Sequence, residues 1–265
     1  MNGWRAVWMV AMAALLAGRG EAKIVEQTLT YPMGDVTARG FLARDDAVTG
    51  AQPGVLVVHE WWGLNDYTKR RARQLAALGY VALAADMYGD GKVAATPQEA
   101  GQLAGAVRGG TLLRTRAAAA LATLRAQPGV DPHRMAAIGY CFGGTTVLEL
   151  AYSGADLAGV VSFHGGLTVP GEQDMGRIKA KILICHGDAD PHVTPAVVRA
   201  CLDGLTRAKA DWQFIAYAGA VHAFTNPDSG NDPSRGVAYN EAADHRSWKA
   251  MSDFFGEIFA TPAGG

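Results

Sequence analysis

The chain has 265 residues, of which 49% are hydrophobic, so it is long enough to bury one substantial core. Its formal net charge of −1 creates no field that would concentrate nucleic acid or an anionic membrane near the surface. These values argue against a nucleic-acid-binding protein and favour small-molecule partners, and they leave the oligomeric state open.

The first segment has the pattern of a secretory signal peptide. Arg5 precedes an apolar stretch at residues 6–17, and small residues follow as far as Ala22. About 12 apolar residues are too few to cross a bilayer core, which needs about 20. We therefore expect residues 1–22 to be a cleaved signal peptide and residues 23–265 to form a single domain. The mature protein is expected to be secreted or periplasmic, without stable membrane insertion.

Short apolar runs alternate with helical stretches along the rest of the chain. Strands are predicted at residues 24–31, 37–43, 55–59, 81–85, 135–139, 159–163, 182–185 and 213–217. Helices are predicted at residues 66–78, 112–126, 145–152, 195–209 and 239–259. This alternation predicts an α/β fold, with a mainly parallel sheet of about eight strands flanked by helices on both faces.

Two predicted strands, at residues 55–58 and 182–184, are apolar at consecutive positions, as is typical of strands covered on both faces. We place them in the middle of the sheet. Ligand sites in such sheets form beyond the carboxyl ends of the strands. The polar residues that follow these and neighbouring strands are Glu60, Cys141, Asp190 and His222.

Residues 139–143, Gly-Tyr-Cys-Phe-Gly, stand where a predicted strand passes into a helix. This is the pattern of a nucleophile elbow, in which glycines remove side chains that would collide across a strained turn. The following helix directs its amino end at Cys141, which favours a thiolate there and offers a backbone N–H to an oxyanion. The sequence therefore predicts Cys141 as a nucleophile.

A thiol nucleophile needs a base, and the base needs an orienting group. His222 follows the last predicted strand, and Asp188 and Asp190 follow the strand before it. Nucleophile, acid and histidine thus occur in the chain order of α/β-hydrolases. Either carboxylate could reach an imidazole from this loop, so the residue pattern alone leaves the acid open between Asp188 and Asp190.

The other two cysteines and the histidines near Asp188 and Asp190 give only weak evidence for a disulfide or a metal site. Cys185 and Cys201 could form a disulfide in an oxidising compartment, but Cys185 lies in an apolar run that is typical of a buried thiol. His186 and His192 flank the two aspartates, yet no second group of ligands with metal spacing accompanies them. We therefore expect no metal and no cofactor.

Four motifs together give a specific resemblance. They are His-Glu-x-x-Gly-Leu-Asn at residues 59–65, Gly-Tyr-Cys-Phe-Gly-Gly at 139–144, His-Gly-x-x-Asp at 186–190 and Gly-x-x-His-x-Phe at 219–224. Over residues 25–259 the chain resembles the dienelactone hydrolase family. The resemblance implies an α/β-hydrolase fold, hydrolysis of a carboxylic ester or lactone, and no cofactor.

The resemblance also assigns roles. It selects Asp190 to complete a catalytic triad with Cys141 and His222, and leaves Asp188 as a turn-capping residue. It implies that the carboxylate of Glu60 hydrogen-bonds the resting thiol until substrate binds. It further implies an oxyanion hole formed by two backbone N–H groups. These groups belong to Trp61 and Phe142.

Aromatic residues near the ends of strands are candidates for the substrate pocket. Trp61 and Trp62 follow the glutamate, while Tyr88 and His164 follow other predicted strands. Tyr140, beside the proposed nucleophile, is a further pocket candidate.

The chain departs from the family pattern at two positions. Where the family places two arginines around a substrate carboxylate, this sequence has Asp90 and Asn226. A carboxylate would lose its charge-assisted hydrogen bonds and meet a like charge. We therefore expect a neutral ester or lactone as substrate. The alternatives are a non-catalytic small-molecule-binding protein on the same scaffold and a thiol redox protein, although no Cys-x-x-Cys pair supports the latter.

Overall fold

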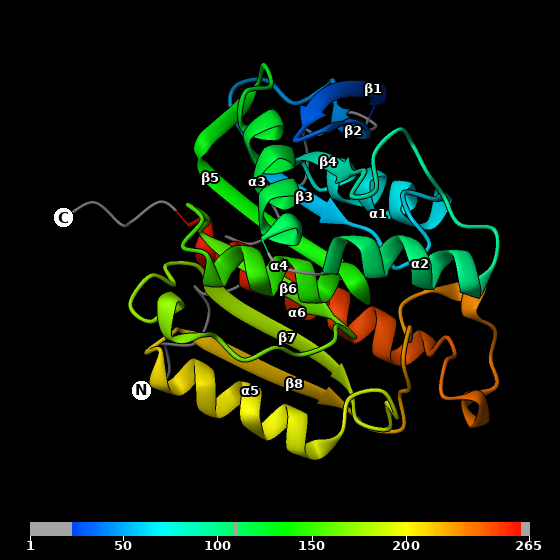
Figure 1. Cartoon of the computed structure of the whole chain (residues 1–265). Coiled ribbons are helices and arrows are strands. Elements are labelled where there is room, and N and C mark those ends of the chain that lie inside the picture. The colour runs from blue at the N-terminus through cyan, green and yellow to red at the C-terminus, as the bar shows by residue number, and fades with distance from the viewer. Residues whose placement is uncertain (1–22, 109–110, 261–265) are drawn as a thin grey trace, which may run out of the picture.

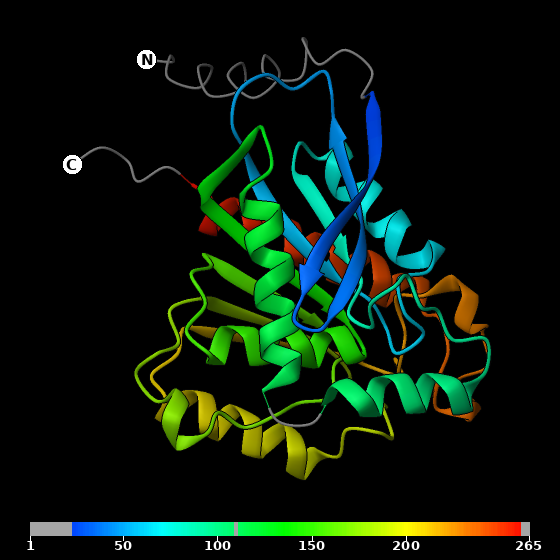
Figure 2. The ribbon, with the colours of Figure 1, turned by 45° about the horizontal axis from the view of Figure 1, so that its top comes forward.

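The computed structural model describes residues 23–108 and 111–260 (Figure 1). Its eight strands form one sheet in the order β1-β2-β4-β3-β5-β6-β7-β8. The strands are β1 (Ile24–Met33), β2 (Val36–Asp45), β3 (Gln52–Val58), β4 (Val81–Ala85), β5 (Val130–Tyr140), β6 (Gly159–Phe163), β7 (Lys181–Gly187) and β8 (Trp212–Tyr217). β1 and β2 form an antiparallel hairpin at one edge, visible as the blue pair in Figure 2, and all pairings from β4 to β8 are parallel.

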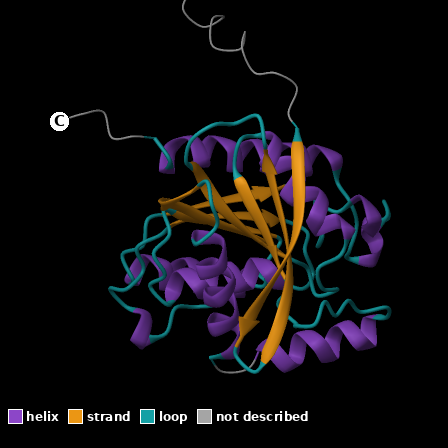
Figure 3. Ribbon diagram, turned by 90° about the horizontal axis from the view of Figure 1, so that it is seen from above, coloured by secondary structure: helices purple, strands orange, loops and turns teal. Residues whose placement is uncertain are grey.

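Within the described residues, six α-helices cover the two faces of this sheet. Figure 3 shows helices on both sides of the strands from above. The helices are α1 (Asp66–Ala77), α2 (Pro97–Arg108), α3 (Leu112–Arg125), α4 (Phe142–Tyr152), α5 (Pro195–Arg207) and α6 (Glu241–Ile258). One core layer joins the sheet to α2, α3, α4 and α5, and the other joins it to α1 and α6. The predicted α/β-hydrolase architecture of about eight strands is therefore confirmed.

The central strand β3 shows why consecutive apolar residues were informative. Leu56 and Val58 belong to one core layer, whereas Val55 and Val57 belong to the other. Successive side chains of a strand point to opposite faces, so a strand covered on both sides needs apolar residues at every position. All four side chains are fully buried.

Helix α2 was missing from the sequence prediction. Its buried face consists of Ala100, Ala104 and Val107, and it contains two glycines. Small side chains give a weak apolar periodicity, and glycine lowers helix propensity, so the local pattern was too faint. This helix matters because its last residue, Arg108, reaches the cavity described below.

Three further sequence expectations concern the signal peptide, membrane insertion and a disulfide. The predicted signal peptide, residues 1–22, lies outside the described residues. Among the described helices, none combines the length and apolar character needed to cross a bilayer. The conceivable disulfide is not formed, because Cys185 and Cys201 are both free, buried thiols.

Candidate active site

Cys141 occupies the sharp turn between β5 and α4, with φ of 54° and ψ of −112°. The turn brings neighbouring backbone segments so close that only glycine fits on either side. A Cβ on Gly139 would lie 2.0 Å from the carbonyl oxygen of Gly143, and a Cβ on Gly143 would lie 2.2 Å from the carbonyl oxygen of Val58. The geometry is that of a nucleophile elbow, as the sequence predicted.

Hydrogen bonds to the last residue of β6 and the residue after it stabilise the strained backbone at Cys141. Its N–H faces the carbonyl oxygen of Phe163 at 3.1 Å and Nδ1 of His164 at 3.2 Å. Nε2 of His164 in turn lies 2.7 Å from the hydroxyl of Thr225. A positive φ at a non-glycine residue persists only where the surroundings fix it, and these contacts provide that support.

His222 and Asp190 meet at the same end of the sheet. Nδ1 of His222 lies 2.7 Å from Oδ2 of Asp190, and Oδ1 of Asp190 accepts the backbone N–H of His192 at 2.8 Å. The exposed Asp188 makes no such contact with the imidazole among the described residues. The geometry therefore places Asp190, rather than Asp188, beside His222.

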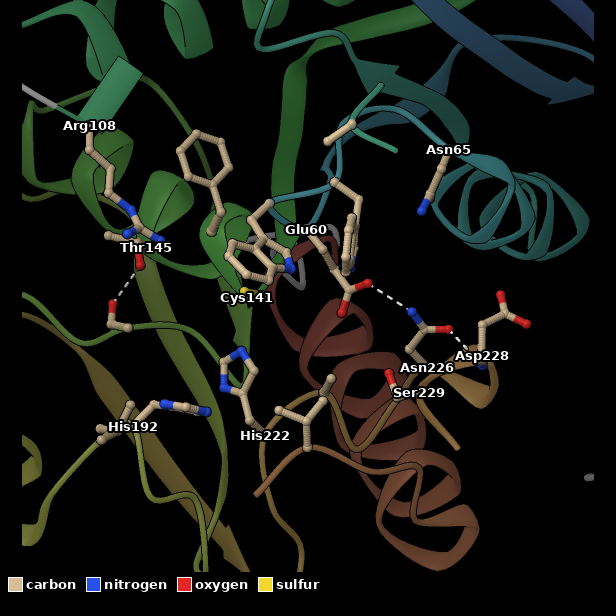
Figure 4. A pocket seen from close by; sticks show the side chains of 18 of the residues that line it. Glu60, Asn65, Arg108, Cys141, Thr145, His192, His222, Asn226, Asp228 and Ser229 are labelled. Carbon is tan, nitrogen blue, oxygen red and sulfur yellow. Dashed lines mark hydrogen bonds between the residues drawn. The ribbon is translucent and has the colours of Figure 1, made fainter. Parts of the chain in front are cut away.

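The electrostatics of this group favour an ionised imidazole. Burial lowers the pKa of His222, but its interactions with Cys141 and Asp190 outweigh burial and raise the pKa well above its usual value. Burial raises the pKa of Asp190, but the hydrogen bond with and the charge of His222, together with the interactions with His192, outweigh burial and lower the pKa below its usual value, so this carboxyl remains ionised at neutral pH. Figure 4 shows the His222 ring directed at the sulfur of Cys141. A proton can therefore pass from the thiol to the imidazole.

Glu60 lies just beyond the end of β3, and its side chain is buried. Its Oε2 accepts a hydrogen bond of 2.8 Å from Nδ2 of Asn226 (Figure 4). Oδ1 of Asn226 accepts the N–H of Asp228 at 3.0 Å, which fixes the amide so that its NH₂ faces Glu60. Burial raises the pKa of Glu60 to about 7, although Asn226 and His222 oppose the rise.

This arrangement differs from the one that the resemblance implied for Glu60. No hydrogen bond joins Glu60 to Cys141 within the described residues, because the carboxylate is turned towards Asn226. The residue that stands in place of a family arginine is thus the partner of Glu60 in this structure.

The two amides expected to form an oxyanion hole come from different elements. Phe142 is the first residue of α4, where a helix leaves its N–H groups without partners inside the helix. Trp61 lies in the loop after β3. Both residues line the same cavity as Cys141 and His222.

The cavity has a volume of about 980 Å³ and contains the proposed nucleophile and base in its wall. Among the other lining residues are Trp61, Trp62, Arg108, His192, Asn226 and Arg235. Sequence reasoning missed Arg108 and Arg235 as pocket residues, because nothing in their local sequence indicates that α2 and a 3-10 turn approach the site. Trp62 lines the cavity as expected.

Three other predicted pocket residues lie behind the cavity instead. Tyr88 is buried and donates its hydroxyl hydrogen to the carbonyl of Trp61 at 2.7 Å. Tyr140 is fully buried and stacks on Phe163, with ring centroids 4.9 Å apart. His164 is fully buried beneath the elbow. These side chains support the site without facing the space for a ligand.

The expectation for Asp90 also needs correction. Asp90 lies in a turn after β4 with φ of 58°, and its side chain is half exposed and paired with Lys92 at 3.3 Å. It is not among the residues that line the cavity. Asp90 therefore presents no like charge to a bound ligand, whereas Asn226 does line the cavity.

The chain is similar to several known proteins. The fold is similar to a dienelactone hydrolase-like promiscuous phosphotriesterase from metagenomic libraries, with 43% identity, a TM-score of 0.86, and coverage of 91% of this chain and 100% of that chain. A candidate carboxymethylenebutenolidase from Saccharolobus solfataricus is 27% identical over 268 residues, covering 88% of this chain and 99% of that protein.

A third protein extends the likeness at the level of the fold. An α/β-hydrolase from a deep-sea metagenome library shares the fold at 16% identity, with a TM-score of 0.62 and coverage of 88% of this chain and 98% of that chain. The profile of the dienelactone hydrolase family matches residues 38–259. The chain therefore belongs to the dienelactone hydrolase family and is a carboxylic ester hydrolase acting on a small molecule.

Proposed function

We propose that Cys141 is the nucleophile and that the chain cleaves a carboxylic ester or lactone through a thioester on its sulfur. The observation that carries the proposal is that Cys141, on a strained elbow, and His222 line one cavity, with Asp190 hydrogen-bonded to the far nitrogen of His222. Nucleophile, base and orienting acid are the parts that such catalysis requires.

The reaction begins when His222 takes the proton of the Cys141 thiol and the sulfur attacks the carbonyl carbon. The negative charge on the carbonyl oxygen is met by the N–H groups of Trp61 and Phe142. The bond between carbon and the alkoxy oxygen then breaks, and His222 gives its proton to that oxygen. A water molecule, deprotonated by His222, attacks the thioester, and the thiolate leaves and recovers the proton.

We further propose that the part of the substrate beside Glu60 is neutral. This corner of the cavity contains Glu60, Asn226 and Asp228, and none of them is a cation. Figure 4 places Arg108 and Asn226 on different sides of Cys141, so Arg108 does not take the place of the missing arginine. Among these three residues a carboxylate would find no charge-assisted partner.

The test is a hydrolysis screen of neutral and anionic esters and lactones, with Cys141→Ala as the control. Wild-type enzyme should turn over neutral substrates faster, and mass spectrometry should find the acyl group on Cys141 during turnover. An acylated wild type and an inactive Cys141→Ala would support the thioester route. Faster hydrolysis of an anionic dienelactone would contradict the neutral-substrate proposal, and undiminished turnover by Cys141→Ala would contradict the nucleophile.

The same screen addresses the alternatives. A non-catalytic binding protein would bind these compounds without turnover, and a thiol redox protein would exchange disulfides through Cys141 instead. A neutral phosphotriester belongs in the screen because the 43% identical relative is described as a promiscuous phosphotriesterase. Asn226, being uncharged, presents no obstacle to such a substrate.

Export is a separate proposal. We infer cleavage after Ala22 and a secreted or periplasmic location, on the basis of the residue pattern of the first 22 positions. N-terminal sequencing of the protein recovered outside the cytosol should begin at Lys23. Recovery of an uncleaved chain in the cytosol would contradict this proposal.

A further inference from the structure

His59 is the last residue before Glu60, and it is fully buried beneath the loop that carries Trp61. Its Nδ1 lies 2.5 Å from the carbonyl oxygen of Glu60, and its Nε2 lies 3.2 Å from the backbone nitrogen of Met87. A carbonyl oxygen only accepts and a backbone N–H only donates. The two contacts therefore require the neutral ring with its hydrogen on Nδ1.

The surroundings keep His59 in this form. Burial lowers the pKa of His59 to about 4, so the ring is neutral at physiological pH. Its ring stacks on that of Phe142, with centroids 5.8 Å apart and an interplanar angle of 16°, and it meets the edge of Tyr88 at 4.8 Å. The ring cannot turn without displacing these neighbours, one of which carries the second oxyanion amide.

The contact with Glu60 controls the orientation of one peptide group. The carbonyl of Glu60 and the N–H of Trp61 belong to the same planar, trans peptide, so they point in opposite directions. The carbonyl of Glu60 accepts hydrogen bonds from His59 and from the N–H of Gly63, the latter at 3.2 Å. Because this carbonyl is fixed towards the interior, the N–H of Trp61 points away from the interior, on the side of the cavity that Trp61 lines.

The next two peptides are fixed as well. Tyr88 donates to the carbonyl of Trp61 at 2.7 Å, and the N–H of Ala94 donates to the carbonyl of Trp62 at 2.8 Å. Three consecutive carbonyls after β3 thus have hydrogen-bond partners, and those of Trp61 and Trp62 are partnered by the segment that follows β4. The imidazole of His59 is the side chain that bonds the peptide that includes the N–H of Trp61, and its contact of 2.5 Å is shorter than that of the Gly63 N–H at 3.2 Å.

We propose that His59 is a positioning residue that holds the Glu60–Trp61 peptide so that the N–H of Trp61 faces the developing oxyanion. The inference rests on the proposed function, because it presumes that an acyl group on Cys141 passes through a tetrahedral intermediate. Loss of this contact would let the peptide rotate, and the oxyanion would lose one of two donors.

Three variants separate the two hydrogen bonds of the ring. His59→Leu removes both. His59→Asn can place an N–H where Nδ1 stands and restore the bond to the carbonyl of Glu60, whereas His59→Gln can place an acceptor near Nε2 and restore only the bond from Met87. Loss of one oxyanion donor lowers kcat about 100- to 1000-fold. We expect kcat to fall by about 10- to 100-fold in His59→Leu and His59→Gln, with KM little changed. The fall is smaller than for complete loss of a donor because the Glu60–Trp61 peptide keeps the productive orientation in a fraction of the molecules. His59→Asn should recover much of the rate.

The rate at which iodoacetamide alkylates Cys141 distinguishes loss of the oxyanion hole from general damage to the site. General damage would change this rate. This reaction needs the thiolate and access to it, but no oxyanion hole. The alkylation rate should stay within about twofold of wild type in all three variants, because these variants lose only the stabilisation of the oxyanion. A parallel fall in alkylation and ester turnover, or a His59→Gln variant as active as His59→Asn, would overturn the inference. If wild-type enzyme itself formed no acyl-thioester, the proposed function would fail instead.

Discussion

Replacing Glu60 with glutamine should change how the stability of the protein depends on pH. Burial raises the pKa of the Glu60 carboxyl from an ordinary value of 4.5 to about 7. Between these two values the folded chain binds a proton that the unfolded chain has released. The stability that Glu60 contributes is therefore fully present below pH 4.5 and is lost as the pH rises through 7. The amide introduced by Glu60→Gln does not titrate, so the variant escapes this loss.

The magnitude follows from the difference of about 2.5 between the two pKa values. Each pKa unit corresponds to about 1.4 kcal/mol, so wild type should lose on the order of 3 kcal/mol of unfolding free energy through Glu60 across this range. Glu60 is almost completely buried, so solvent screening does little to reduce this cost, and its pKa reaches about 7 even though Asn226, His222 and Arg71 oppose the rise.

The assay is urea unfolding of wild type and Glu60→Gln at half-unit steps from pH 4.5 to 9. The difference between the two unfolding free energies, taken as variant minus wild type, should rise by about 3 kcal/mol and level off above pH 7.5. Other titrating groups are common to both proteins and cancel in the difference. A difference that stays constant, or that falls as the pH rises, would refute the assignment of a proton to buried Glu60.

Three further predictions concern the acid, the elbow and the substrate. Asp190→Asn should lower kcat by a factor on the order of 10³ to 10⁴, as loss of the orienting carboxylate does in catalytic triads. The control variant Asp188→Asn should keep a kcat near that of wild type in the same ester assay. Equal losses would contradict the choice of Asp190. Gly139→Ala should lower the free energy of urea unfolding by about 3 kcal/mol or more, because its Cβ would lie 2.0 Å from a backbone oxygen. In the control variant Gly105→Ala, the new Cβ meets no atom within 4 Å, so this change should stabilise α2 by about 0.5–1 kcal/mol. Similar effects at both sites would contradict the packing argument. Asn226→Arg should raise the ratio of kcat/KM for anionic over neutral esters by about 10- to 100-fold, the value of a charge-assisted hydrogen bond, and an unchanged ratio would show that the substrate carboxylate binds elsewhere.

Much of the frame could be predicted because it depends on local patterns. The consecutive apolar residues of β3 and β7 predicted strands covered on both faces, and the glycines around Cys141 predicted the strained turn. Strand period and turn chemistry depend on neighbours a few residues apart, which one sequence displays directly. Helix α2 escaped because alanine and glycine give that local signal too weakly.

The partners of the site residues could not be predicted in this way. Glu60 and Asn226 are 166 positions apart, and the side chain of Glu60 could have faced the thiol or the amide with the same local sequence. Tyr88 and His164 both follow strand ends, yet each is turned behind the cavity by a hydrogen bond to a backbone or side-chain group from another segment. Side-chain direction depends on which loops meet, and that is a property of the assembled sheet.

The sequence by itself determined the sheet, the elbow at Cys141 and the set of loops that could supply a base and an acid. The family resemblance selected Asp190 over Asp188, and the tertiary structure places Asp190 beside His222. Only the tertiary structure decided that Glu60 bonds Asn226 and that an imidazole at position 59 holds the peptide before Trp61. The physical reason is range: apolar period and backbone strain act between near neighbours, whereas hydrogen-bond partners are chosen by distances of a few ångströms that exist only once distant strands lie side by side.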